Sequence, residues 1–126
     1  MRVRCIAERL THEQAVAHYY PHPPDMRISF AASLGVEYEV YSINCTYPFA
    51  MLGISDETGL LYPTPLCLFE IIDPRPASSW VVRVNEKGVV HLEPPSFHEH
   101  YFEDLADGVP EVDEDFRQIR EQVESV

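Results

Sequence analysis

The sequence has no long apolar run, and this absence excludes one class of structure at the outset. No stretch of its 126 residues approaches the roughly 20 consecutive apolar residues that a membrane-spanning helix needs. The first five residues, MRVRC, also lack the apolar segment of a secretory signal. We therefore expect a cytoplasmic protein that does not use a membrane as its partner.

Cysteine and glycine are scarce, and their positions exclude several kinds of site. The three cysteines, Cys5, Cys45 and Cys67, have no Cys-x-x-Cys spacing, so we expect reduced and buried thiols. The five glycines are scattered singly, which leaves no glycine-rich loop to hold a phosphate. No Gly-x-Ser-x-Gly turn places a nucleophile beside a histidine. The sequence thus predicts no catalytic residue, no resident metal and no cofactor.

Positive charge is also scarce, and the excess of negative charge lies mostly near the carboxyl end. The net charge is −12, from nine lysines and arginines against 21 aspartates and glutamates. From residue 99 onward ten carboxylates face two arginines, a balance of −8, which leaves −4 for the first 98 residues. Such a field repels phosphate backbones and anionic lipids, so we expect neither nucleic acid nor a membrane surface as partner. A basic protein is the partner that this charge favours.

What the chain does contain is a series of strand-like segments separated by turn residues. Residues 34–41 alternate between apolar and polar, and residues 49–55 are an apolar run that ends at a short acidic loop. Gly59 closes this loop and can take the positive φ that a hairpin needs. Residues 80–84 and 89–92 are β-branched runs that predict a second hairpin.

Neighbouring strands with short connections form a meander, whose apolar face must curl or be covered. A further strand is expected at residues 2–6, with Val3 and Cys5 on one side. We therefore predict a mainly β fold with flanking helices, either a small SH3-like barrel or a curled antiparallel sheet. The whole chain is expected to form a single domain, with the β core at about residues 1–93 and a helical tail at about residues 97–124.

One flanking helix is predicted as an insertion near the N-terminus. Thr11 and Gln14 match a capping box, and the helix should continue to about residue 20. Its expected apolar positions are Ala15, Val16 and Tyr19. Prolines at positions 21, 23 and 24 should end it, and residues 27–31 are expected to form either another short strand or the entry to the meander.

The second flanking helix is predicted to begin at Pro110, a residue that the first turn of a helix tolerates. Four apolar side chains then fall on one stripe, at the spacing i, i+4, i+7 and i+11: Val112, Phe116, Ile119 and Val123. This amphipathic helix should lie on the β core.

Several of these segments together resemble a known kind of protein. The strands at residues 2–6 (RVRCI), 34–40 and 62–71, with the segment at residues 94–112, are similar to small SH3-like barrels of an uncharacterised bacterial family of acidic proteins. Several members of that family resemble immunity proteins, which neutralise a toxin made by the same cell. The resemblance covers most of the chain and implies no catalytic residue, although the insertion at residues 11–30 departs from the minimal barrel.

Two functions of different classes follow from the sequence. The first is a non-enzymatic protein-binding module, possibly an immunity-like inhibitor, that docks a basic partner through an acidic surface. The candidate contact residues are four carboxylates and two aromatic groove residues: Glu111, Asp113, Glu114, Asp115, Tyr41 and Tyr62. For Trp80, packing into the core competes with a place in such a groove, and we expect core packing. An acidic surface that only keeps the protein soluble is the alternative reading of the charge.

The second function is a small metal- or ligand-dependent enzyme that uses the region from His98 to Asp104. His98 and His100, with Glu93, Glu103 and Asp104, have the side-chain chemistry of metal ligands. On a helix the two histidines would diverge, so a solvated polar face competes with a metal site. A structural adaptor is a third reading that the sequence does not separate from the first.

Overall fold

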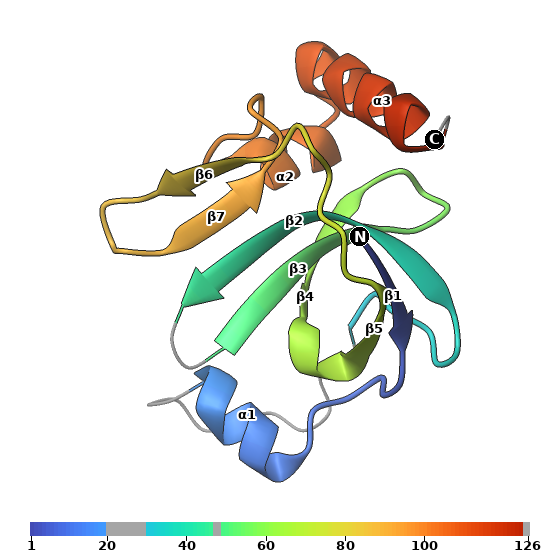
Figure 1. The fold of residues 1–126 in the computed structure, drawn as a ribbon. Coiled ribbons are helices and arrows are strands. Elements are labelled where there is room, and N and C mark those ends of the chain that lie inside the picture. The colour runs from blue at the N-terminus through green and yellow to red at the C-terminus, as the bar shows by residue number, and fades with distance from the viewer. Residues whose placement is uncertain (20–29, 47–48, 125–126) are drawn as a thin grey trace.

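Seven strands and three α-helices make up the part of the chain that this computed structural model describes, residues 1–19, 30–46 and 49–124 (Figure 1). The strands are β1 (Arg2–Cys5), β2 (Glu37–Thr46), β3 (Phe49–Ser55), β4 (Leu61–Pro65), β5 (Phe69–Asp73), β6 (Val81–Val84) and β7 (Val90–Glu93). The helices are α1 (His12–Tyr19), α2 (Tyr101–Ala106) and α3 (Pro110–Glu124), with a 3-10 turn, η1 (Leu66–Leu68), between β4 and β5. None of these helices combines the length and the apolar character needed to span a bilayer.

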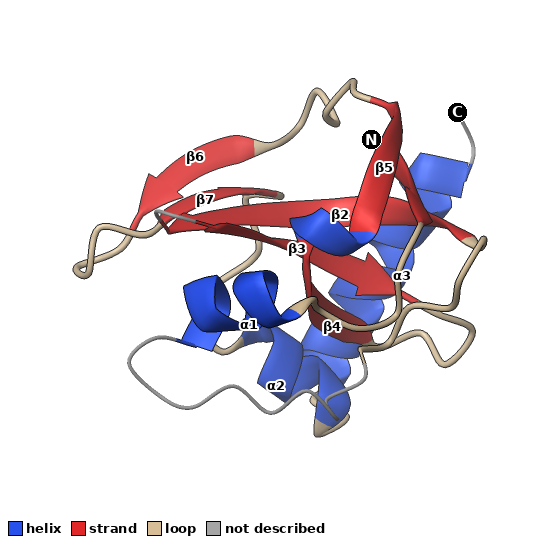
Figure 2. Cartoon of the chain, turned by 90° about the horizontal axis from the view of Figure 1, so that it is seen from below, coloured by secondary structure: helices blue, strands red, loops and turns tan. Residues whose placement is uncertain are grey.

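The sheet is antiparallel and is organised around β2. Along one edge, β2 pairs with β3, which pairs in turn with β4. Along the other edge, β1 pairs with the first residues of β2 and β7 with its last residues, while β5 lies beside β1 and β6 beside β7. Among the described strands no pairing joins β4 to β5, so the sheet curls without closing (Figure 2). The prediction of a mainly β fold with flanking helices is confirmed, and its antiparallel sheet is curled and not closed among the described strands.

A register shift in β2 lies where the two apolar cores of the protein meet. Val40 pairs with Ile54 and Ser42 pairs with Gly53, which leaves Tyr41 as an extra residue between two paired positions. All three consecutive residues of β2 are buried, whereas a regular strand with one covered face would alternate. Val40 belongs to the first core, inside the curled sheet, and Tyr41 belongs to the second core, beneath α2 and α3.

The predicted stripe of α3 forms much of the second core. Val112 and Phe116 are buried, and Ile119 and Val123 are half-buried against the same cluster. The ring of Phe116 meets the ring of Tyr41 edge-on, with 5.1 Å between the ring centroids. The prediction that this helix lies on the β core is confirmed.

At the other end of the molecule, α1 rests on the first core through a narrow face. The Thr11 N–H donates to Gln14 Oε1 (2.9 Å), and the Gln14 N–H donates to Thr11 Oγ1 (3.2 Å), the reciprocal pair of a capping box. Ala15 is buried, but Val16 is 40% exposed, because the helix touches the core through Ala15. The prediction of an apolar contact for Val16 is therefore wrong. The side chain of Tyr19, the prolines at positions 21, 23 and 24, and most of the strand predicted at residues 27–31 lie outside the described residues.

The three cysteines are free thiols in three different environments. Cys5 is buried in the first core and Cys67 is half-buried, and burial raises the pKa of both thiols. Cys45 is exposed, because it lies near the end of β2, where the strand leaves the core. The prediction of a buried thiol is confirmed for Cys5 and wrong for Cys45.

The β3–β4 turn contacts α3 through Gly59, and this contact gives a prediction. Gly59 has φ +79°, and a Cβ atom added there would lie 2.9 Å from Nη1 of Arg120. We expect Gly59→Ala to lower the free energy of unfolding by about 1–2 kcal/mol, measured by urea denaturation. Gly88→Ala is the matched control, since Gly88 has φ +80° and nothing within 4 Å of the added Cβ. Equal decreases in the free energy of unfolding for the two variants would show that the contact of the added methyl group with Arg120 is not destabilising.

Candidate functional site

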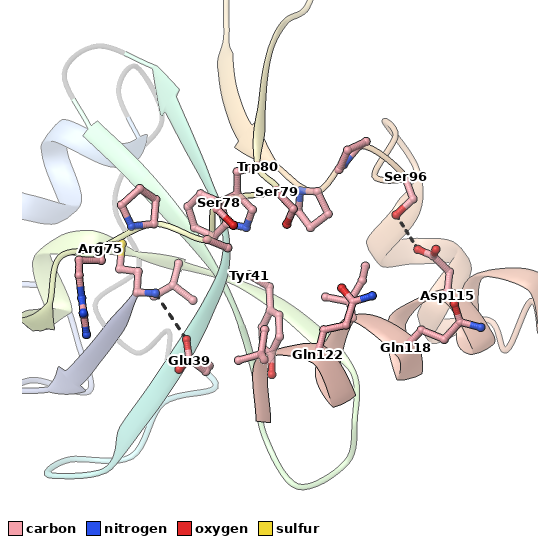
Figure 3. Close-up of a pocket in the computed structure, with 18 of the residues that line it drawn as sticks. Glu39, Tyr41, Arg75, Ser78, Ser79, Trp80, Ser96, Asp115, Gln118 and Gln122 are labelled. Atoms are coloured by element: carbon pink, nitrogen blue, oxygen red, sulfur yellow. Dashed lines mark hydrogen bonds and ion pairs between the residues drawn. The ribbon is translucent and has the colours of Figure 1, made fainter. Parts of the chain in front are cut away.

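A cleft of about 820 Å³ lies between the curled sheet and α3 (Figure 3). One wall is formed by residues of β2 and by the loop at residues 74–80, and the opposite wall by α3. Figure 3 shows Tyr41 in the middle of this space, between the loop that carries Trp80 and the helix that carries Gln118 and Gln122. The volume falls within the range of about 300–1,000 Å³ that is usual for ligand-binding pockets.

The apolar part of the lining combines aromatic rings with prolines. Trp80 is half-buried and packs against the first core, as predicted, yet it also lines the cleft. Tyr41 contributes from β2, and Pro76, Pro94 and Pro95 add further apolar surface to the lining. Rigid apolar surface of this kind suits the stem of a long side chain or an extended segment of chain.

Two of the three carboxylates in the lining have a cationic partner within the chain. Arg75 donates from Nε to Asp73 Oδ1 (2.9 Å) and from Nη2 to Asp73 Oδ2 (2.7 Å). This paired hydrogen bonding holds the pKa of Asp73 well below its ordinary value. Glu39 lies 3.6 Å from the amino group of Met1 and 3.8 Å from Nη1 of Arg2.

The third carboxylate, Asp115, is held by neutral groups. Ser96 Oγ and Tyr101 Oη each donate a hydrogen bond of 2.7 Å to the same oxygen, Asp115 Oδ2. Burial, and then the bond to Asp115, raise the pKa of Tyr101, which keeps this donor protonated and uncharged at neutral pH. Within residues 1–19, 30–46 and 49–124 no arginine, lysine or histidine forms an ion pair with Asp115.

The structure does not bring the six predicted contact residues together at one site. Tyr41 and Asp115 meet at the cleft, where Tyr41 is buried against Phe116 and offers only part of its ring. Glu111 and Asp113 are exposed in the first turn of α3. Tyr62 is half-buried on β4 with its hydroxyl 3.3 Å from Thr58 Oγ1, and it is not part of the cleft lining.

Glu114, the remaining predicted contact residue, is engaged within α3 itself. It accepts hydrogen bonds from Arg117 Nε (3.0 Å) and Nη2 (2.6 Å), and from Gln118 Nε2 (3.1 Å). These bonds lower the pKa of Glu114, and Arg117 also donates to Glu121 (2.6 Å). Glu114 therefore offers a partner less free charge than Glu111 or Asp113.

Comparison of the chain with protein families, curated proteins and solved structures finds no match. The likeness to immunity proteins with SH3-like barrels therefore stays a prediction. A functional proposal therefore depends on the fold, on the distribution of charge and on the cleft between β2 and α3.

The histidine region predicted as the alternative site forms two separate local pairs. His98 Nε2 lies 3.7 Å from Asp104 Oδ2, and His100 Nδ1 lies 3.3 Å from Glu103 Oε2. In the part of the chain that the structure describes, no three His, Cys, Asp or Glu side chains converge as metal ligands would. Glu93, which the sequence grouped with these histidines, lies instead in a different polar network.

This network crosses three strands, and the sequence analysis missed it. Glu93 is only 4% exposed and accepts hydrogen bonds from Arg83 Nε (3.2 Å) and Nη2 (3.3 Å). His91 Nδ1 lies 2.7 Å from Asn44 Oδ1 and 3.4 Å from Glu93 Oε1. Cross-strand pairing of Arg83 with His91, and of His91 with Asn44, puts all four side chains on one face. The alternation of His91 and Glu93, opposite Arg83 in a predicted hairpin, was the signal available in the sequence.

The network predicts a pH dependence of stability that belongs to His91. Burial and the nearby guanidinium of Arg83 lower the pKa of His91 below its ordinary value of 6.5, against the opposing effect of Glu93. As pH falls through 6.5 the unfolded chain therefore binds a proton more readily than the folded chain does, and the free energy of unfolding decreases. His91→Asn keeps a donor for Asn44 and removes this proton.

We expect the wild type to lose more stability than His91→Asn when urea unfolding is compared at pH 7 and about pH 5. The other histidines contribute equally to both proteins and cancel in the difference. Parallel stability curves for the two proteins over this range would contradict the assignment.

Proposed function

We propose that this chain is a non-enzymatic protein-binding module that docks a basic partner through the acidic surface formed by α2 and α3. The observation that carries the proposal is the concentration of charge, because a balance of −8 out of −12 belongs to residues 99–126. These two helices lie together at one end of the molecule (Figure 1), and α3 also lines the cleft. A partner therefore meets most of the net charge on one side.

The charge that supports docking is the part that the chain does not pair internally. Glu114 and Glu121 share Arg117, and Arg120 lies over the ring of Phe116 at 5.9 Å from its centroid. Glu111 and Asp113, by contrast, are exposed and form no ion pair within the described part of the chain. Unpaired carboxylates attract a basic surface at long range and give fast, salt-sensitive association.

An immunity-like inhibitor of a toxin is the most concrete form of this proposal, and a basic toxin such as a nuclease is the matching partner. We place the encounter in the cytoplasm, which three free thiols support. The competing reading, in which the acidic surface only maintains solubility, differs in one testable respect, because it requires no particular carboxylates.

Matched charge variants test the proposal. Glu111→Gln with Asp113→Asn removes two charges from α3, and Glu57→Gln with Glu86→Gln removes two exposed charges from the hairpin turns. In affinity purification from the native cell, we expect a basic protein to be retained by the wild type and by the turn variant. Retention by the α3 variant should fall by roughly threefold or more, as for the loss of charges that steer association.

Salt provides the second measurement on the same partner. Raising the ionic strength from about 0.01 M to about 1 M shortens the Debye length from roughly 30 Å to roughly 3 Å, so the retained protein should be released. Equal retention by the two charge variants, or retention indifferent to salt, would favour a surface that only maintains solubility.

A further inference from the structure

The cleft contains one negative charge that the described chain leaves unbalanced. Asp73 is paired with Arg75, and Glu39 lies near Arg2 and the Met1 amino group. Among the described residues, the side-chain hydrogen bonds to Asp115 come from two hydroxyls, and both reach the same oxygen, Oδ2. Hydroxyl donors fix the position of a carboxylate without cancelling its charge. A cationic group is therefore the complement that this side of the cleft lacks.

The stripe of α3 that faces the cleft sets the size of the occupant. Asp115, Gln118 and Gln122 all line the cleft, and their spacing of three and four residues places them on one face of the helix. At 1.5 Å per residue this stripe is about 10.5 Å long. An extended chain covers that length with about three residues, at roughly 3.3 Å each. Gln118 and Gln122 place amide side chains along this stripe, and Gln118 Nε2 donates to Glu114 Oε1 (3.1 Å).

The opposite wall suits one cationic side chain better than the other. Trp80 offers apolar ring surface on the wall opposite the helix (Figure 3), Pro76, Pro94 and Pro95 also line the cleft, and Tyr41, which is buried against Phe116, adds only part of its ring. A guanidinium is planar, stacks on aromatic rings, and matches a carboxylate with two parallel N–H groups. A lysine ammonium is a compact and strongly hydrated charge that gains less from this surface.

We propose that the cleft receives one arginine side chain, presented by an extended segment of the basic partner, with its guanidinium bound to Asp115. This inference rests on the proposed function and adds the element of the partner that is recognised. The acidic surface of α2 and α3 steers the partner to this side of the molecule. The cleft then binds a single arginine side chain of the partner by direct contact.

A tripeptide probe tests the cleft without knowledge of the partner. We expect acetyl-Gly-Arg-Gly-amide to produce saturable shifts in ¹H–¹⁵N spectra at the Trp80 indole and at the side-chain amides of Gln118 and Gln122, with a Kd of about 1 mM. The analogue with citrulline has the same shape without the charge and should bind at least roughly tenfold more weakly. The lysine analogue should also bind more weakly than the arginine peptide.

Two variants separate the charge from the shape of the cleft. Asp115→Asn keeps an oxygen that can accept from Ser96 and Tyr101, and it should abolish the saturable shifts. Gln118→Arg leaves Asp115 in place but supplies a guanidinium three residues away on the same helix face, and it should block the probe. Gln118→Ala is the matched control for that variant and should retain most of the binding.

The proposal is overturned if the wild type shows no saturable shift, if citrulline or lysine binds as well as arginine, or if Asp115→Asn binds equally. Its failure is distinguishable from failure of the proposed function. If partner capture depends on Glu111 and Asp113 while the arginine peptide does not bind, the result contradicts the arginine site in the cleft but not the acidic docking surface. If the peptide binds but partner capture does not depend on these two carboxylates or on salt, the result contradicts the acidic docking surface and supports the arginine site.

Discussion

Replacing Phe116 with alanine is expected to lower the free energy of unfolding by about 3–5 kcal/mol, the usual range for truncating a fully buried aromatic ring. Phe116 is 1% exposed and is in edge contact with Tyr41, so it joins α3 to the central strand β2. Its removal leaves a cavity between helix and sheet, because the backbone of neither element can close the gap without disturbing other contacts.

Urea unfolding followed by circular dichroism measures this loss, and Ile119→Ala is the matched control on the same stripe. Ile119 is only half-buried, so its truncation should cost less than half as much. Because α3 is one wall of the cleft, Phe116→Ala should also weaken binding of the arginine peptide even where the protein remains folded. A decrease in the free energy of unfolding of less than about 1 kcal/mol would mean that the packing of α3 on the sheet does not depend on Phe116.

A methyl group added at Gly53 is expected to cost about 1–3 kcal/mol through overpacking. The new Cβ atom would lie 2.3 Å from Ser42 Oγ on β2 and 2.8 Å from Cζ of Phe102. Both distances are far below van der Waals contact, so the hydroxyl of Ser42 and the ring of Phe102 must both move. Glycine at this position thus leaves room for the Phe102 ring of α2 beside β3.

A double-mutant cycle with Ser42→Ala divides this cost between the two neighbours. Ser42 Oγ is buried and has no hydrogen-bond partner among the described residues, so Ser42→Ala alone should be neutral or stabilising by about 1 kcal/mol. In the Ser42→Ala background only the clash with Phe102 remains, and Gly53→Ala should cost less than it does in the wild type. If the two losses are equal, the clash with Ser42 is not the cause of the destabilisation.

Local periodicity was enough to predict the elements that depend on neighbouring residues. The apolar stripe of α3 and the strand at residues 49–55 were predicted with nearly the observed bounds, because their patterns repeat at helix and strand spacing. The exposure of Cys45 could not be predicted in this way. It depends on how far β2 extends beyond the core, and that is set by the partners β3 and β7.

Closure of the sheet and the chemistry of the cleft depend on contacts between distant residues. Whether β4 meets β5 is decided by the curvature of the whole sheet, which no local pattern records. Asp115 was predicted as one of four exposed carboxylates, yet its hydroxyl partners Ser96 and Tyr101 lie 19 and 14 residues away. Of the two aromatic candidates, Tyr41 reaches the cleft because the register shift in β2 turns it toward α3, while Tyr62 stays on the far strand β4.

That shift in β2 also governs how the protein comes apart. Val40 and Tyr41 are adjacent, yet they belong to different apolar clusters. Unfolding of either cluster therefore disturbs the segment of β2 that supports the other. Heating should therefore give one cooperative transition, in which sheet and carboxyl-terminal helices are lost together. The amides at the middle of β2 should be among the last to exchange with solvent deuterium.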